Sequence, residues 1–249
     1  MIGRGALISL GFVLLGATLA ALVARVRARQ QGLEVQHAID GLFVVLLAGV
    51  LVSHVSGALL FRWSEVVRDP VLLLPGSGAA WSLGAIAGAA GAGWLYFSRR
   101  APGALWQHAD NLVLALCLGW GVGRIGCFLH HDHLGQLTSF PLGVRVAGAL
   151  RHDLGLYEAV LALGLFALLW TLQRRRRAPG VLVGVAALVY GAGRFGIELL
   201  RATDLELLGR RSNARYLGLT LVAHACVLLC ACGLVLLRWP ARSATAVRC

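Results

Sequence analysis

The chain contains seven apolar stretches, each close to the length of a helix that crosses a membrane. A bilayer core of about 30 Å is crossed by about 20 helical residues. Because backbone groups find no water there, only helices or closed barrels can span it, and the alternation of barrel strands is missing. The stretches are Ala6–Val23, Gly41–Phe61, Ala79–Phe97, Leu112–Leu129, Leu154–Leu172, Val181–Leu200 and Tyr216–Leu237. The sequence therefore predicts an all-α, polytopic membrane protein, a bundle of seven transmembrane helices in one domain over residues 1–249.

Composition supports this class and narrows the choice of partners. Hydrophobic residues make up 58% of the chain and charged residues 14%, and the mean hydropathy is +0.76. The formal net charge of +12 is explained by basic loops beside anionic lipid headgroups. The sequence has neither the spacing of a zinc finger nor a module of interleaved basic and aromatic residues. Nothing in it therefore indicates nucleic-acid binding. We therefore expect membrane lipids as partners, and no nucleic acid.

Arginine placement predicts the orientation, because the chain contains no lysine. Cytoplasmic loops carry an excess of basic residues. The predicted odd-numbered helices end beside Arg25, Arg27, Arg29, Arg99, Arg100, Arg174–Arg177, Arg238, Arg242 and Arg248. These ends are predicted to be cytoplasmic, which places the N-terminus outside and the C-terminus inside.

Two arginines, Arg124 and Arg194, lie within apolar stretches. An ionised guanidinium costs roughly 3 kcal/mol there on insertion scales, so each needs an anionic partner or a water-filled cavity. At 1.5 Å per residue both lie roughly 20 Å from the predicted cytoplasmic helix ends. They should therefore meet something negative at one depth, in the outer half of the membrane.

Other charged residues are predicted at the same depth. One helical stripe carries Tyr190, Arg194, Glu198 and Arg201, because residues three or four apart share a helix face. Glu158 lies in the preceding predicted helix, at about the same depth in the membrane as the two arginines. We expect Glu198 to pair with Arg194 or Arg201, which leaves one guanidinium available to a ligand. The alternative is an internal ion-pair network that only fixes helix packing.

Three ordered motifs carry these charges. They are Gly123-Arg124-Ile125-Gly126-Cys127-Phe128 leading to Gly135, then Arg151-His152 with Leu156-Tyr157-Glu158-Ala159, and Tyr190-Gly191, Arg194-Phe195, Glu198, Arg201 and Asp204. In order and spacing they resemble the motifs of the bacterial phosphatidylglycerol–prolipoprotein diacylglyceryl transferases. The resemblance covers most of the chain. It implies a multi-pass enzyme of the bacterial cytoplasmic (inner) membrane that acts in lipoprotein biosynthesis.

The resemblance implies transfer of the diacylglyceryl group of phosphatidylglycerol to the lipobox cysteine thiol of a prolipoprotein signal peptide, with release of glycerol phosphate. It implies no cofactor, and we expect no metal. A guanidinium suits phosphate geometry, whereas a thiol of pKa about 8.5 needs a base or a strongly positive site. We expect Arg194 and Asp132 to be catalytic, with His130 as a replacement base; the expected substrate-binding residues are Arg124, Gly126, Gly135, Glu158, Tyr190, Glu198 and Arg201.

The chain departs from the family pattern at several positions, among them an N-terminal tyrosine that is missing from the first helix. Ser82 stands at or near the family's helix-three histidine, Cys127 and His130 replace two asparagines, and Asp132 replaces a glutamate. Serine is no base at neutral pH. Two functions therefore stay open, an active transferase and a non-catalytic homologue that retains an anionic-phospholipid cavity.

The segment His130-His131-Asp132-His133 offers a replacement base. Imidazole has a pKa near 6.5 and suits proton transfer, and His152 is a further candidate. Two other interpretations stay open. The segment is an ordinary polar helix end, or it is a zinc or copper site in a metal-handling membrane protein. Neighbouring residues of one segment rarely all face one ion, so the catalytic interpretation is preferred over the metal.

The orientation is testable by labelling cysteines introduced at Gln136 and Arg175 in intact cells. A membrane-impermeant thiol reagent should label Gln136→Cys, which is predicted to be external, and should not label Arg175→Cys, which is predicted to be cytoplasmic. The parent protein supplies the background from natural cysteines, and permeabilised cells show that both new thiols can react. The reverse pattern would place the motifs on the cytoplasmic side.

Overall fold

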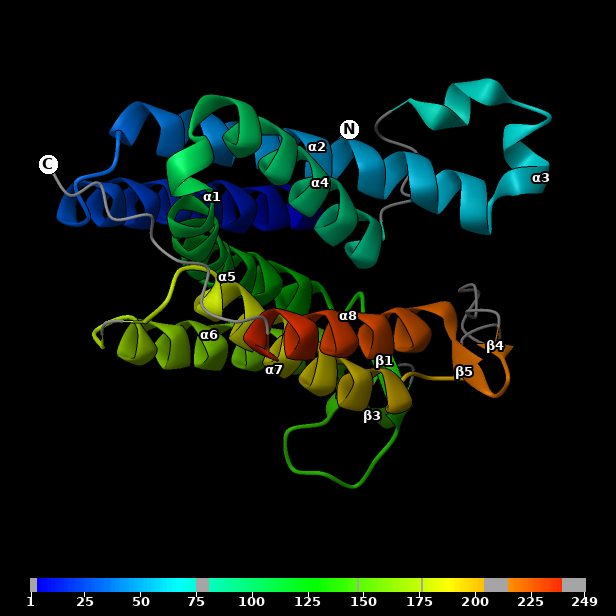
Figure 1. Ribbon diagram of the computed structural model, residues 1–249. Coiled ribbons are helices and arrows are strands. Elements are labelled where there is room, and N and C mark those ends of the chain that lie inside the picture. Colours follow the sequence, from blue (N-terminus) through cyan, green and yellow to red (C-terminus); the bar gives the residue numbers. More distant parts are fainter. Residues whose placement is uncertain (1–3, 75–80, 147, 176, 204–214, 239–249) are drawn as a thin grey trace, which may run out of the picture. The chain divides into compact units, whose positions relative to one another are not determined.

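The computed structural model describes residues 4–74, 81–146, 148–175, 177–203 and 215–238 (Figure 1). The chain divides into two compact units. The larger unit comprises Met1–Val23 and Val113–Cys249, and the smaller unit comprises Ala24–Leu112. Two helices, α1 (Arg4–Gln30) and α5 (Leu105–His130), have one part in the larger unit and the other part in the smaller unit.

The smaller unit is built around a close pair of helices, α2 (Val35–Phe61) and α4 (Ser82–Arg100). Short helices α3 (Trp63–Val66), η1 (Pro70–Leu73) and η2 (Pro102–Ala104) complete it. Glycine allows the two long helices to touch, since a Cβ on Gly88 would lie 2.7 Å from the carbonyl oxygen of Ala48. Small residues that let backbones approach are common where membrane helices pack.

The larger unit holds most of α5 together with α6 (Leu154–Leu172), α7 (Val181–Leu199) and α8 (Leu221–Arg238). Its apolar core consists of Leu114, Leu165, Leu169, Leu182 and Ala186. Helices α7 and α8 are in close contact, because a Cβ on Gly233 would lie 2.8 Å from the carbonyl oxygen of Gly184.

Two small antiparallel sheets occupy loops of the larger unit. Strands β1 (Leu134–Leu137), β2 (Val144–Val146) and β3 (Ala149–Asp153) pair in the order β1-β3-β2. Strands β4 (Arg215–Tyr216) and β5 (Leu219–Thr220) form a hairpin. Its turn residues Leu217 and Gly218 both have positive φ, as a tight hairpin turn requires. The all-α expectation thus omitted the loop sheets.

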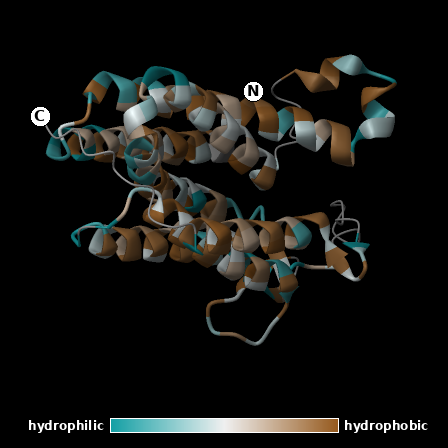
Figure 2. Cartoon of the chain, viewed as in Figure 1, coloured by the Kyte–Doolittle hydropathy of each residue, from teal (hydrophilic) through white to brown (hydrophobic). Residues whose placement is uncertain are grey.

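Helices lie at all the predicted apolar stretches, and hydrophobic residues cover their lengths (Figure 2). Within the described residues, α1, α2, α5, α6, α7 and α8 are long and apolar enough to cross a membrane, by length and composition. Helix α4 is not among these six, so a seventh span stays a prediction, as do the orientation and the single domain. Several boundaries differ from the prediction: α1 continues to Gln30, α2 begins at Val35 and α5 begins at Leu105. The last predicted stretch begins outside its helix. Tyr216 lies in the β4–β5 hairpin, and α8 begins only at Leu221.

The contact between α7 and α8 predicts that Gly233→Ala destabilises the protein by about 1–3 kcal/mol, the usual cost of overpacking. The added methyl would meet backbone atoms of Leu188 and Gly184, which cannot move aside as a flexible side chain would. Thermal unfolding in detergent measures the effect. Gly164→Ala on α6 is the control, because a Cβ there meets nothing within 4 Å. Equal unfolding temperatures for the two variants would contradict the close contact.

Candidate functional site

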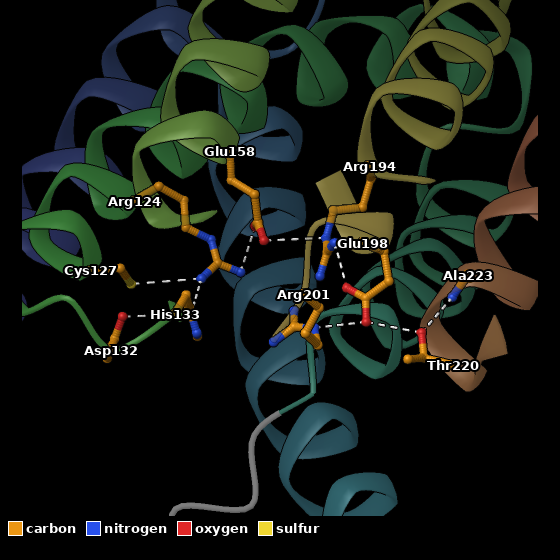
Figure 3. Close-up of polar contacts among 10 residues, drawn as sticks. All are labelled: Arg124, Cys127, Asp132, His133, Glu158, Arg194, Glu198, Arg201, Thr220 and Ala223. Atoms are coloured by element: carbon orange, nitrogen blue, oxygen red, sulfur yellow. Dashed lines mark hydrogen bonds and ion pairs between the residues drawn. The ribbon is translucent and has the colours of Figure 1, made fainter. Parts of the chain in front are cut away.

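Glu158 on α6 joins the two buried arginines. Its Oε2 lies 2.8 Å from Nη2 of Arg124 on α5, and its Oε1 lies 3.2 Å from Nε of Arg194 on α7. The exposed fractions of the three residues are 1% for Glu158, 8% for Arg124 and 2% for Arg194. The predicted convergence of charges from three helices is confirmed (Figure 3).

Further ion pairs and hydrogen bonds connect these residues to the start of α8. Nη1 of Arg194 donates to Oε2 of Glu198 at 2.7 Å, and Nε of Arg201 donates to Oε1 of Glu198 at 2.7 Å. The hydroxyl of Thr220 donates to the same Oε1 at 2.9 Å and accepts from the backbone N–H of Ala223 at 3.2 Å. The expectation that one guanidinium stays unpaired was wrong, because each carboxylate holds two arginines.

The resulting network alternates in sign, in the order Arg124, Glu158, Arg194, Glu198, Arg201 (Figure 3). Three guanidiniums face two carboxylates, so the network carries one surplus positive charge. A guanidinium has five N–H donors, and these ion pairs use only some of them. The network can therefore still bind an anion although no arginine in it is unpaired.

Local backbone structure explains why Glu158 reaches Arg124. The carboxylate of Asp153 caps α6 by accepting from the backbone N–H of Leu156 at 3.2 Å. Just inside this cap, a Cβ on Gly155 would lie 3.0 Å from the backbone nitrogen of Phe128 on α5. The start of α6 is thus pressed against the end of α5, and Glu158 projects from the first turn that follows.

Arg124 meets a second group of side chains on its other side. Its Nη1 donates to Nε2 of His133 and lies 3.7 Å from Sγ of Cys127. Oδ1 of Asp132 lies 3.8 Å from Nε2 of His133. Partial burial raises the pKa of the Asp132 carboxyl, and the nearby Arg124 guanidinium opposes this. Because a guanidinium N–H can only donate, Nε2 of His133 is the acceptor in this contact.

The histidines of the 130–133 segment have different surroundings. Nδ1 of His131 lies 2.7 Å from Oδ2 of the fully buried Asp153. Nε2 of His130 is buried and has no hydrogen-bond partner among the described residues. Among the histidines of this segment, only His133 is hydrogen-bonded to Arg124. The segment therefore does not form a site of three converging imidazoles, and His152 instead pairs with the hydroxyl of Tyr157 at 2.7 Å.

Two polar atoms at the charged network, the hydroxyl of Tyr190 and Nε of Arg124, are buried with neither a hydrogen-bond partner nor an ion-pair partner among the described residues. Tyr190 lies within electrostatic range of Arg124, Glu158 and Arg194. Buried polar groups are nearly always satisfied, so unsatisfied ones in a native structure need an explanation. A ligand that brings hydrogen-bonding oxygens would provide one.

The two glycines that were expected to bind substrate, Gly126 and Gly135, lie in close contact with neighbouring elements. A Cβ on Gly126 would lie 3.2 Å from Cα of Ser9 on α1. A Cβ on Gly135 would lie 2.8 Å from the carbonyl oxygen of Leu200, where β1 forms a bridge to Arg201. A side chain at Gly135 would therefore collide with the backbone that precedes Arg201.

Sequence reasoning missed Asp153 and Thr220. Each precedes an apolar run, and Asp or Thr at that place is a helix N-cap signal. The signal does not show that Thr220 would also bind Glu198, or that Asp153 would also bind His131. Ser82 lies in the smaller unit, and motif residue Asp204 lies outside the described residues.

The shared carboxylate predicts that Glu158→Gln destabilises the protein by about 3–5 kcal/mol, since it leaves buried charge uncompensated. Glu65→Gln is the control. It breaks the Arg62–Glu65 pair, whose side chains are 21% and 32% exposed, and such pairs are worth about 0–1 kcal/mol. Thermal unfolding in detergent compares the two variants. A loss no larger for Glu158→Gln than for Glu65→Gln would show that Glu158 does not neutralise the arginines.

Comparison with known proteins identifies the family. Residues 8–239 match the family model described as prolipoprotein diacylglyceryl transferase. The phosphatidylglycerol–prolipoprotein diacylglyceryl transferase of Chromohalobacter salexigens is 32% identical over 74% of this chain and 71% of its own length. The proteins of the same name from Solidesulfovibrio magneticus and Symbiobacterium thermophilum are each 31% identical, over 78% and 85% of this chain and 76% and 80% of their own lengths. The chain belongs to the prolipoprotein diacylglyceryl transferase family.

Proposed function

We propose that this protein transfers the diacylglyceryl group of phosphatidylglycerol to the lipobox cysteine of a prolipoprotein. The observation that carries the proposal is the buried network with its surplus positive charge, which extends from Arg124 to Arg201 among apolar helices. The curated relatives are named for phosphatidylglycerol and prolipoprotein. The proposed location is the bacterial cytoplasmic membrane, where both substrates are embedded in lipid.

The phosphodiester of phosphatidylglycerol carries one negative charge, which matches the one surplus positive charge of the network. Guanidinium N–H groups of Arg124 and Arg194 that are not used by the glutamates donate to its oxygens, with Arg201 at the more accessible end. The Tyr190 hydroxyl, buried without a partner in the described part of the chain, supplies a further donor. Glu158 and Glu198 hold the guanidiniums in place, because oriented donors stabilise developing charge best.

In the reaction the acceptor sulfur attacks the diacylglyceryl carbon that is bonded to the phosphate oxygen. A carbon–sulfur bond forms, the carbon–oxygen bond breaks, and its electron pair leaves with the phosphate. Glycerol phosphate departs with the added charge, which the arginines stabilise, Arg194 in particular. The products are a thioether and glycerol phosphate.

The acceptor thiol must also lose its proton. Near Arg124 the chain offers Asp132, which is half exposed, and the histidines His130 and His133. Proposed catalytic roles therefore fall to Arg194, Asp132 and His130 together with His133. Ser82, at or near the place of the family's helix-three histidine in the resemblance, is no base at neutral pH.

The proposal is tested with purified protein in phosphatidylglycerol vesicles and a lipobox peptide. Arg124→Ala and Arg194→Ala should each lower diacylglyceryl transfer by about 10²–10³-fold, the usual cost of losing one donor to developing charge. Lysine at either position should restore only part of the rate, because it lacks bidentate geometry. Arg145→Ala is the matched control, since Arg145 is exposed on β2. Parent-like turnover by both alanine variants would refute phosphate binding by the network.

A non-catalytic homologue that binds anionic phospholipid is the alternative, favoured by Ser82 and Cys127 at positions where the family has histidine and asparagine. Expression in cells depleted of their own transferase separates the two functions. Restored lipoprotein lipidation supports the enzyme. Binding of phosphatidylglycerol vesicles over phosphatidylcholine vesicles, without restored lipidation, supports the alternative.

A further inference from the structure

Three side chains beside Arg124 are not required for phosphate binding. Cys127 lies in the last turn of α5, and Asp132 and His133 lie between α5 and β1. One sulfur, one carboxylate oxygen and one imidazole nitrogen from these residues lie within 4.8 Å of one another. Figure 3 shows the three side chains grouped on the side of Arg124 opposite Glu158. Thiolate, imidazole and carboxylate are the groups that bind zinc in proteins.

We infer that Cys127, Asp132 and His133 bind a divalent transition-metal ion of the zinc class and leave its fourth position open. Zinc–ligand bonds of about 2.0–2.3 Å put tetrahedral donors roughly 3.3–3.8 Å apart, so these donors must approach by about 1 Å. Asp132 and His133 lie outside regular secondary structure and can make this movement, whereas the α5 helix fixes Cys127. The soft sulfur selects zinc over magnesium or calcium.

The ligands can balance the charge of a divalent ion, although they lie beside the Arg124 guanidinium. A thiolate and a carboxylate neutralise the two charges of the ion, and Glu158 already pairs with the Arg124 guanidinium. In the metal-free protein the donor groups face a cationic N–H, because Nη1 of Arg124 donates to Nε2 of His133 and lies 3.7 Å from Sγ of Cys127. A metal at Nε2 would take the same lone pair, so the ion and Arg124 compete for His133.

The open position suits the acceptor thiol, and this step rests on the proposed function. A thiol that binds the ion does so as thiolate and releases its proton to water. The thiolate sulfur then attacks the diacylglyceryl carbon, and the electron pair of the broken carbon–oxygen bond leaves with the phosphate. The ion would then activate the thiol in place of a general base, and Asp132 and His133 would act as its ligands rather than as the bases proposed above. This inference departs from the expectation, drawn from the sequence, that the protein holds no metal.

The test is a Co²⁺ titration of the full-length protein, stripped with a chelator and held in detergent without lipid or peptide. The parent should show thiolate-to-cobalt charge-transfer absorption and the strong visible bands of a four-coordinate site, and Zn²⁺ should displace the cobalt. Cys127→Ser should abolish the charge-transfer band. Asp132→Asn and His133→Gln should each weaken Co²⁺ binding by at least about tenfold, since even outer-shell changes cost that much. Cys117→Ser, on the same helix, and His130→Gln are matched controls that should bind as the parent does.

Arg124→Ala gives an independent result, because it removes the competitor for His133. It should bind Co²⁺ more tightly than the parent while losing transfer activity. A parent without the charge-transfer band, a band that survives Cys127→Ser, or weaker Co²⁺ binding by Arg124→Ala overturns the metal site.

Turnover measurements separate this inference from the proposed function. If the parent binds Co²⁺ at Cys127 but transfers no lipid, the metal site stands and the transferase proposal fails. If the parent transfers lipid at full rate after stripping and binds no Co²⁺, the reverse holds. Transfer that is lost on stripping and restored by Zn²⁺ supports both.

Discussion

The pairing of Glu158 with two guanidiniums is the interaction on which the larger unit depends. Each arginine comes from a different helix and is almost wholly buried. A lone guanidinium in an apolar bundle would be expensive, whereas a single carboxylate between two of them offsets much of the cost and fixes three helices at one level. The capped, glycine-bearing start of α6 positions this carboxylate, and the rest of the charged network extends from it.

The extension to α8 gives the network a second anchor. Glu198 receives hydrogen bonds from Arg194, Arg201 and Thr220, and Thr220 also begins α8 through its bond to Ala223. A helix start and a charged residue of the site thus share one hydroxyl. The orientation of Arg201 therefore follows the position of α8, and an uncharged hydroxyl at the start of that helix helps to shape the proposed anion-binding site.

The sequence predicted what depends on periodicity and on the cost of burying charge. The apolar stretches became helices, and the two buried arginines met carboxylates from neighbouring helices, because few arrangements satisfy a guanidinium in an apolar environment. Pairings between residues distant in sequence were not predictable. Glu198 was expected to take one arginine and takes two, and His131 turned to Asp153 while His133 turned to Arg124. Such choices depend on the loop sheet and the hairpin, whose short strands leave little periodic signal.

The geometry of Arg124 also bears on how such a site can change during evolution. Its Nη2 pairs with the buried Glu158, whereas Nη1 faces Cys127 and His133. A change of the side chain at residue 127 would therefore leave the ion pair with Glu158 in place. The proposed phosphate contact and the proposed thiol-facing side chains thus meet at one residue yet can vary separately. Arg124 marks the boundary between a constrained part of the site and a part in which new chemistry can arise.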